Sequence, residues 1–330
     1  MTRLDDILKL LLNFDGISRK LVLPSIIDKL RFSSFGGDSP HGLGEDSAAI
    51  GTESDELILL TTDAIVEDLC LKHPHAAGFN AVLANVMDIY AAGGTPTSFA
   101  VALSYAKSEI GEAILDGLIK GSHTFKVPIV RGHTNPNSTS TYVVGSATGT
   151  VQKKNILTAG GADDGDDLVV LFDQTGQRGA HYQLGWDSVT DRPSENVVKR
   201  LTVMNDIAER KLVTAAKDVS VAGIVGTAAM MLEYSGKGGI IDLDAIDHAK
   251  PKDIDLNDWL RMYISLGFLV ATNEESLEDL KKVAKDHDLT ACRIGIVDDT
   301  RVVKLSMDGE TRIMFDFTKG PALTPRTGHD

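Results

Sequence analysis

Residues 57–94 read LILLTTDAIVEDLCLKHPHAAGFNAVLANVMDIYAAGG, and this stretch decides the fold of the first half of the chain. Its first four residues form an apolar run, which predicts a buried strand that ends near Thr62 and Asp63. The Ala-rich segment that follows predicts a helix, on which Asn85 and Asp88 lie three residues apart and therefore on one face. Two glycines mark the end of that helix. Because a core helix has no packing need for such a polar face, the stretch predicts a scaffold that points carboxylates at a cation.

The length and composition of the chain indicate a globular protein with more than one core. It has 330 residues, of which 42% are hydrophobic and 24% are charged. This length is typical of two domains. The polar, Gly-rich and acidic stretch 152–167 is the expected boundary. We therefore predict an N-terminal domain over 1–155 and a C-terminal domain over 156–330.

Charge and cysteine content exclude several classes of function. The net charge is −14, from 47 acidic and 33 basic residues, so no nucleic-acid partner is expected, because phosphate contacts need Lys and Arg. A nucleotide bound through a divalent metal remains compatible with this charge. No run reaches the ~18–20 apolar residues of a membrane span. Cys70 and Cys292 have no ligand spacing, and the N-terminus lacks a leader pattern, so we expect reduced thiols in a cytoplasmic protein.

Apolar runs typical of strands alternate with longer segments of helical periodicity, which predicts an α/β (α+β) fold. In the first half, strands are expected at 57–62, 98–104, 127–130 and 141–151, and helices at 75–92 and 108–125. In the second half, a helix is expected at 194–211, strands 291–297 and 301–306 are expected to pair as a hairpin, and 321–330 to be disordered.

Four aspartates occupy Gly-flanked or strand-end positions: Asp46, Asp63, Asp88 and Asp218. Mg²⁺ prefers oxygen ligands, usually one or two carboxylates together with substrate phosphates. Carboxylates on separate loops are therefore suited to hold Mg²⁺ against a triphosphate. The simpler interpretation of any one of them is a turn or cap residue. No P-loop, dinucleotide fingerprint, nucleophile elbow or zinc motif is present in the chain.

Five motifs, taken in order, resemble the AIR synthase (PurM-like) superfamily, whose members include thiamine-monophosphate kinase. The likeness covers roughly residues 44–317 and is greatest to AIR-synthase-related proteins of the methanogenesis-marker type. The motifs are GEDSAAIG (44–51), TTDAIVED (61–68), NVMDIYAAGG (85–94), RGHTNPN (131–137) and KDVSVAG (217–223).

This resemblance implies a PurM-like two-domain fold. The N-terminal sheet would pair with that of a second copy to form a barrel at a homodimer interface. ATP and Mg²⁺ would bind in the cleft between the domains and across the dimer. The resemblance also implies a role for each matching residue. Asp46, Asp63 and Asp88 would be metal ligands, Thr62, Asn85, His133 and Thr134 would contact the nucleotide, and Asp218 and His133 would serve catalysis.

Two departures from the kinase pattern leave the reaction open. His133 stands where thiamine-monophosphate kinases carry a carboxylate, and Val221 stands where they carry another. We therefore predict ATP- and Mg²⁺-dependent phosphoryl transfer to, or activation of, a small metabolite. The alternatives are a non-catalytic dimer that binds a nucleotide or metabolite, and a metal-dependent phosphate hydrolase. The acceptor is expected around 173–193 and 256–268. Lys20, in the N-terminal arm, is interpreted as part of a solvated helix start, with contact to the phosphates as the alternative.

Overall fold

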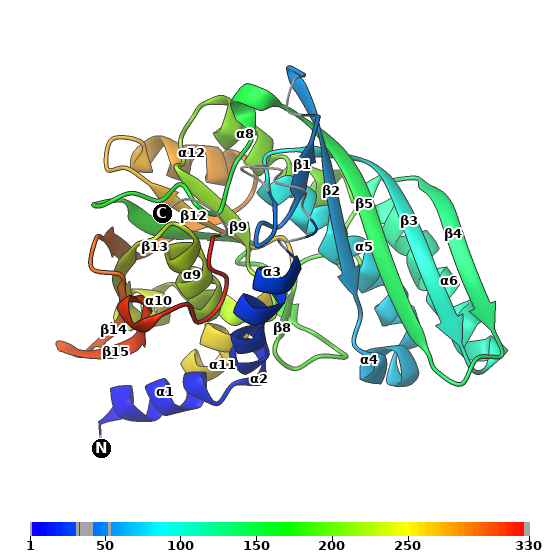
Figure 1. The fold of residues 1–330 in the computed structure, drawn as a ribbon, viewed down its shortest axis with the longest axis horizontal. Coiled ribbons are helices and arrows are strands. Elements are labelled where there is room, and N and C mark those ends of the chain that lie inside the picture. The colour runs from blue at the N-terminus through cyan, green and yellow to red at the C-terminus, as the bar shows by residue number, and fades with distance from the viewer. Residues whose placement is uncertain (1, 31–32, 34–41, 52–53, 327–330) are drawn as a thin grey trace.

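The computed structural model describes residues 2–30, 33, 42–51 and 54–326. The first half of the chain forms a five-stranded sheet in the order β1-β2-β5-β3-β4 (Figure 1). Neighbouring strands run antiparallel except β3 and β4, which are parallel. Its strands are β1 (Ala48–Ile50), β2 (Glu56–Ala64), β3 (Thr95–Tyr105), β4 (Ile129–Pro136) and β5 (Tyr142–Gln152).

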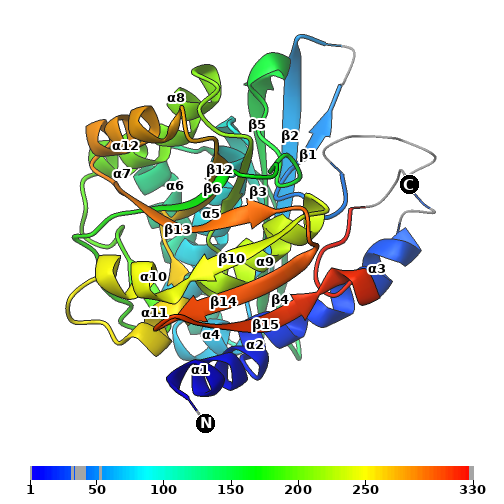
Figure 2. The same ribbon diagram turned by 90° about the vertical axis from the view of Figure 1, so that its left-hand side faces the viewer.

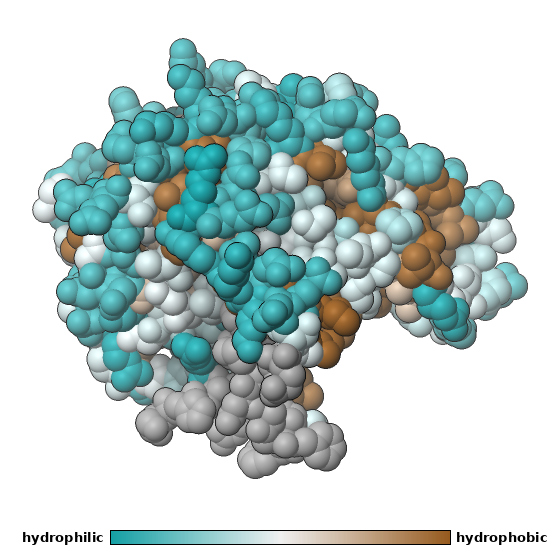
Figure 3. All heavy atoms as spheres, turned by 90° about the horizontal axis from the view of Figure 1, so that it is seen from above, coloured by the Kyte–Doolittle hydropathy of each residue, from teal (hydrophilic) through white to brown (hydrophobic). Residues whose placement is uncertain are grey.

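Among the described residues, helices cover one face of this first sheet. Along β2, Leu57 and Leu59 are buried against that helical layer, whereas Ile58 and Leu60 on the other face are 49% and 40% exposed. Side chains alternate between the two faces of a strand, so this pattern defines an open face. Hydrophobic residues gather over this part of the molecule, at the right of Figure 3. The helices of this half are α4 (Glu67–Lys72), α5 (Pro74–Ala91) and α6 (Ser108–Phe125).

The second half forms a seven-stranded sheet in the order β15-β14-β10-β13-β6-β12-β9 (Figure 2). Every residue of β6 is buried, and its side chains alternate between two hydrophobic cores. One of these cores continues into the helices of the first half, so both halves share it. The strands are β6 (Asp167–Phe172), β9 (Ala215–Asp218), β10 (Gly238–Asp242), β12 (Phe268–Thr272), β13 (Thr290–Asp298), β14 (Val302–Met307) and β15 (Glu310–Asp316).

Helices pack on both faces of the second sheet, as expected for a fully buried strand such as β6. The α7 and α8 helices replace the single helix predicted at 194–211. The helices are α7 (Ser194–Leu201), α8 (Val203–Glu209), α9 (Gly223–Tyr234), α10 (Leu243–Ala249), α11 (Leu256–Arg261) and α12 (Leu277–Asp286), with short 3₁₀ turns at Lys153–Asn155 and Phe317–Lys319.

The N-terminal arm packs on the second half of the protein. Leu4, Ile7 and Leu11 are buried in the core of the second sheet. The predicted domain 1–155 groups this arm with the first sheet, whereas these contacts place it against the other half. The division at 155/156 itself stays a prediction. The arm consists of α1 (Arg3–Leu12), α2 (Asp15–Ser18), the 3₁₀ turn Arg19–Val22 and α3 (Leu23–Leu30).

A small third sheet joins the two segments in which the acceptor site is expected. The strand β8 pairs with β7 and, in parallel, with β11. The pairing brings the segments 173–193 and 256–268 side by side, although more than 60 residues separate them in sequence. The strands are β7 (Gln177–Arg178), β8 (Gly185–Asp187) and β11 (Tyr263–Ile264).

The predicted α/β class is confirmed, and two further local predictions are wrong. The strands β13 and β14 do not form a hairpin, because β10 lies between them. The segment after 320 is not disordered as far as residue 326, since Leu323 is buried and its backbone N–H donates to Glu233 (2.7 Å). Neither large sheet closes within the described ranges, so the barrel stays a prediction. None of the described helices combines the length and apolar character needed to cross a bilayer.

Candidate functional site

A cavity of about 2200 Å³ lies where the first sheet, the N-terminal arm and the second half meet. Its wall includes the end of β2, the start of α5, the small third sheet and the turn between β9 and α9. The volume exceeds the roughly 300–1,000 Å³ of a typical single-ligand pocket. The cavity therefore has room for two ligands side by side.

Three carboxylates converge on the wall of this cavity. Oxygen atoms of Asp46, Asp88 and Asp218 lie within 4.8 Å of one another. Asp46 precedes β1, Asp88 lies on α5 and Asp218 ends β9, so the tertiary fold joins three distant parts of the sequence. The arrangement has the ligand type that a hard divalent cation prefers.

Local structure fixes each of these carboxylates. The turn that carries Asp46 needs a glycine at 44, because Gly44 has φ +99° and a Cβ there would lie 2.7 Å from the Tyr234 ring. The carboxylate of Asp88 accepts a hydrogen bond from the hydroxyl of Thr61 on β2. The backbone N–H of Asp218 donates to Asp46 (3.3 Å), which links the second half to the first.

The cluster carries more negative charge than its burial favours. Burial, followed by repulsion from Asp63, raises the pKa of Asp88 well above its usual value. Burial, followed by repulsion from Asp46, raises the pKa of Asp218 to about 7. Groups with such values hold protons near neutral pH unless positive charge is supplied. A bound cation is one source of that charge, so the residues present fit a divalent metal.

Two lysines face the same carboxylates. Lys217 is buried and forms an ion pair with Asp46. Burial alone would lower the pKa of Lys217, but Asp46 and Asp218 raise it, so the ammonium group stays charged. Lys20, on the arm, also lines the cavity, and burial followed by the charge of Lys217 lowers its pKa. The arm is thus part of the cavity wall rather than a solvated helix start.

The other residues that were predicted from the sequence do not all lie on the cavity wall. Asp63 and Thr62 line the cavity, but Asp63 is not among the three converging carboxylates. Asn85 is fully buried, donates to the Ala81 carbonyl (2.9 Å) on its own helix, and is absent from the cavity wall. The functional roles predicted for these side chains stay predictions.

His133 and Thr134 lie on β4, the exposed edge strand of the first sheet, and not on the cavity wall. The register pairs His133 with Ala102 and Thr134 with Leu103. Because Leu103 is buried under the helices, His133 shares the open face and Thr134 points to the opposite face. They therefore do not line one cleft within a single copy.

Sequence reasoning missed two polar groups of the cavity, Lys217 and Tyr263. The signal for Lys217 was a lysine inside the short apolar strand before Asp218, which is an unusual position for a solvated side chain. Tyr263 lines the cavity, and its buried hydroxyl has no hydrogen-bond partner among the described residues. Burial and the carboxylate of Asp218 raise its pKa well above the usual value, so this phenol stays a hydrogen-bond donor.

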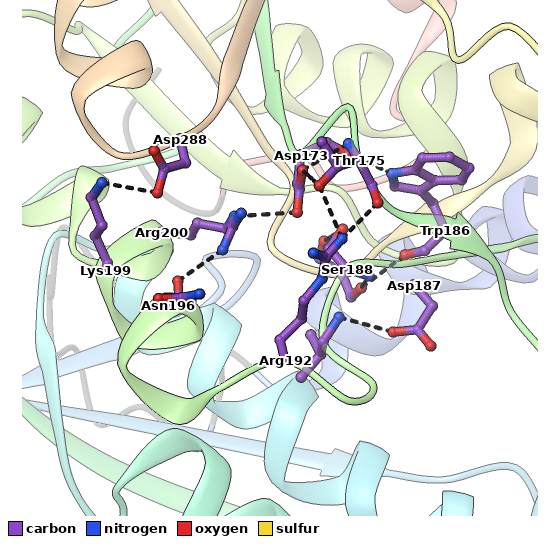
Figure 4. Close-up of polar contacts among 12 residues, drawn as sticks. Asp173, Thr175, Trp186, Asp187, Ser188, Arg192, Asn196, Lys199, Arg200 and Asp288 are labelled. Atoms are coloured by element: carbon purple, nitrogen blue, oxygen red, sulfur yellow. Dashed lines mark hydrogen bonds and ion pairs between the residues drawn. The ribbon is translucent and has the colours of Figure 1, made fainter.

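A polar network fixes the long loop after β6 against the cavity (Figure 4). The carboxylate of Asp173 pairs with the guanidinium of Arg200 (3.2 Å), and both side chains are buried. The Asp173 carbonyl accepts a hydrogen bond from the indole of Trp186 (2.8 Å). Asp187 accepts two backbone N–H bonds, both 2.9 Å, from residues two and three positions further on. The network holds β8 in a defined place on the cavity wall.

Family models match both halves of the chain. Residues 44–151 match the AIR synthase related protein, N-terminal domain, and residues 164–308 match its C-terminal domain. An uncharacterised protein of Methanocaldococcus jannaschii is 33% identical and covers 93% of this chain and 95% of its own length. One from Synechocystis is 35% identical and covers 87% of each chain. A thiamine-monophosphate kinase of Buchnera aphidicola is 25% identical, covering 63% of this chain and 68% of its own.

Solved structures share the fold. The T. maritima PurL complexed with ATP superimposes with a TM-score of 0.70 at 16% identity, and covers 90% of this chain and 48% of its own length. This chain thus spans about half of that protein. AaThiL complexed with AMPPCP and TMP has a TM-score of 0.61 at 18% identity, and covers 88% of this chain and 96% of its own.

Proposed function

This chain is a member of the AIR synthase-related (PurM-like) family, and on that premise we propose that it uses ATP and Mg²⁺ to phosphorylate or activate a small metabolite. The observation that carries the proposal is the convergence of Asp46, Asp88 and Asp218 at one wall of a cavity large enough for two ligands. Relatives of this chain include a kinase, and one solved neighbour holds ATP.

The roles that we assign to individual side chains follow from their positions around the cavity. The carboxylates of Asp88 and Asp218 would hold Mg²⁺, and Asp46 and Asp63 would add negative charge beside them. When bound, Mg²⁺ neutralises phosphate charge and helps to align the group that is transferred. The ammonium group of Lys20, on the arm that forms part of the cavity wall, would contact phosphate oxygens. In this reaction class most of the rate comes from positioning and charge neutralisation.

We assign the acceptor to the side of the cavity formed by the small third sheet. Tyr263 on β11 and Ser220, in the turn between β9 and α9, each have a buried hydroxyl without a partner in the described part of the chain. An unmade hydrogen bond of this kind costs about 1–3 kcal/mol, which a polar ligand would recover. Asp187 lines the same side and adds an acceptor. These groups suit a metabolite that carries hydroxyl or amine groups.

We also propose that the working form is a homodimer that uses the open face of the first sheet. That face combines exposed apolar side chains, such as Ile58 and Tyr142, with His133. A second copy on this face would cover the apolar residues. It would also bring the partner's β4 towards the cavity, which gives His133 a route to a site that it does not reach within its own chain.

Isothermal titration calorimetry with ATP and Mg²⁺ tests the binding step. We expect wild-type protein to bind, and Asp88→Asn or Asp218→Asn to weaken binding at least tenfold, because each removes one of the converging charges. Asp163→Asn, at an exposed carboxylate paired with Lys237, is the matched control and should bind like wild type. Absence of binding by wild type, or full binding by the Asp88→Asn/Asp218→Asn protein, would overturn the proposal.

Turnover separates this function from its alternatives. Incubation with ATP, Mg²⁺ and pooled hydroxyl- or amine-bearing metabolites should yield ADP only when the acceptor is present. Binding of ATP without ADP formation in any pool would favour a non-catalytic dimer. Release of phosphate from simple phosphate esters without nucleotide would indicate a hydrolase.

A further inference from the structure

The ion pair between Lys217 and Asp46 lies inside the carboxylate cluster and has no part in the function proposed above. The ammonium group of Lys217 contacts one carboxylate oxygen of Asp46, and the backbone N–H of Asp218 donates to the other (3.3 Å). The side chains of Lys217 and Asp46 are only 5% and 11% exposed. Both oxygens of Asp46 are therefore engaged by this chain itself.

The other two converging carboxylates are less committed. Asp88 accepts one hydrogen bond, from the hydroxyl of Thr61. The carboxylate of Asp218 has no hydrogen bond or ion pair with any residue that the structure describes, apart from the electrostatic influence of its neighbours. Asp88 and Asp218 are thus the pair with free oxygen lone pairs at the cavity wall.

The charge balance of the cluster also favours a single divalent cation. Four carboxylates, on Asp46, Asp63, Asp88 and Asp218, face two ammonium groups, on Lys20 and Lys217, which leaves a formal charge of −2. Glu45 also lines the cavity, and its carboxylate, which accepts the backbone N–H of Ala159 (2.8 Å), adds a fifth negative charge that makes the formal balance −3. Two divalent ions would exceed this negative charge, whereas one does not.

We propose that Lys217 is a fixed cation that neutralises Asp46, so that the cluster binds one divalent ion, on Asp88 and Asp218. Without the lysine, the free carboxylates would bind that ion more strongly or bind a second ion. The lysine would also keep the two halves of the protein joined when no metal is present, because Asp46 precedes the first sheet and Lys217 lies on β9, an edge strand of the second. The inference depends on the proposed function only for the divalent site.

Binding of Mn²⁺ without nucleotide tests this inference, with free Mn²⁺ measured by electron paramagnetic resonance. Wild-type protein should bind one ion per chain. Lys217→Met should lower the Kd for Mn²⁺ at least tenfold or add a second ion, because it frees Asp46 and removes a repelling charge. Lys237→Met, which removes a lysine that bridges Asp163 and Asp299, is the matched control and should bind like wild type. Equal or weaker Mn²⁺ binding by folded Lys217→Met would overturn the inference.

A paired variant keeps the test decisive if Lys217→Met does not fold. Replacing both partners, in Asp46→Asn/Lys217→Met, removes the buried charges together, which is milder than breaking a buried pair. This protein should bind one Mn²⁺ within about threefold of the wild-type Kd, because its ligands are retained. Loss of Mn²⁺ binding would show that Asp46 is already a ligand and would contradict the inference. Mn²⁺ binding without ATP binding would count against the proposed function alone.

Discussion

The two large sheets differ in how their faces are covered. In the described part of the chain the first sheet has helices on one face, and β2 alternates between exposed and buried residues from Glu56 to Thr62. The second sheet lies between two layers, and β6 is buried at every position. An alternating strand indicates a sheet with one free face, and a continuously apolar strand indicates a sheet covered on both.

This difference shows that the second sheet is covered on both faces by its own chain, whereas the first sheet leaves one face accessible to other molecules. The second sheet supplies stability through its two cores. The first sheet presents side chains that its own chain does not cover, and the cavity lies at the junction of the two. Substitutions in the two sheets should therefore have unlike effects.

The largest expected effect is on the core of the second sheet. Phe172→Ala should lower the free energy of unfolding by about 3–5 kcal/mol, because the side chain is fully buried and its loss leaves a cavity. Ile58→Ala, at an exposed position on the first sheet, should change it by less than about 1 kcal/mol. Urea unfolding followed by circular dichroism measures both. Equal losses for the two variants would contradict the contrast between the sheets.

The next largest effect should be on oligomeric state. Val144→Asp places a charge in the middle strand of the open face, where Val144 pairs with Ala64 and Ala102. We expect it to weaken the proposed dimer at least tenfold, because an unpaired charge would be buried at the interface. Ile313→Asp, at a 58% exposed position on the second sheet, is the control. Light scattering with size-exclusion chromatography gives the masses, and a monomeric wild-type protein would refute the dimer.

A smaller effect is expected from pH, which should change the affinity of the carboxylate cluster for Mg²⁺ by about tenfold. The pKa of Asp218 is raised to about 7 in the folded protein, whereas an aspartate in the unfolded chain has a pKa near 4. The metal-free protein therefore loses stability as pH rises from about 4 through about 7. A divalent cation should offset this loss, so Mg²⁺ should bind more tightly at pH 8 than at pH 6. Melting temperatures with and without Mg²⁺ measure the effect. A similar Mg²⁺-dependent shift at both pH values would exclude proton competition.

The smallest effect concerns a contact that joins the two halves. The side-chain amide of Asn205 on α8 donates to the carbonyls of Gly93 and Gly94, both at 3.0 Å. Asn205→Ala should lower the free energy of unfolding by about 1–2 kcal/mol, because two carbonyls lose their donor. Asn13→Ala, which removes a similar bond within the arm, should cost less. Urea unfolding measures both losses, and an equal loss for the two variants would contradict the contribution assigned to this contact.

Local sequence predicted most elements, because their patterns depend on neighbours in the chain. The helix expected at 108–125 is α6 with the same bounds, and the strand expected at 141–151 is β5, shifted by one residue. The error at β13 and β14 arose because adjacency in sequence favours a hairpin, whereas β10 inserts from further upstream. The ordered tail was missed because the carboxylate of Glu233, which accepts three of its backbone N–H groups, is about 90 residues away.

The residues of the candidate site also divide into those that the sequence identified and those that only the tertiary structure placed. Asp46, Asp88 and Asp218 were identified from the sequence because they stand in motifs that resemble those of the AIR synthase superfamily, although each of them alone also suits a turn or cap. Asn85 and Asp88 were assigned to one face from their spacing. Only the packing of α5 under the first sheet decides that Asn85 is enclosed and Asp88 meets the cavity. The placement of His133 on an open face follows from strand register, which sequence spacing does not reveal.

In the stretch 57–94, hydrophobic periodicity and glycine stops act over a few residues, so they predict a strand and a helix that bears Asp88, but not the short helix α4 between them. Tertiary structure decided which charges meet. Lys217 lies 171 residues from Asp46, yet the two form a buried ion pair in the cavity wall. Electrostatic energy depends on distance through space and on burial, and neither quantity is written in the order of the residues.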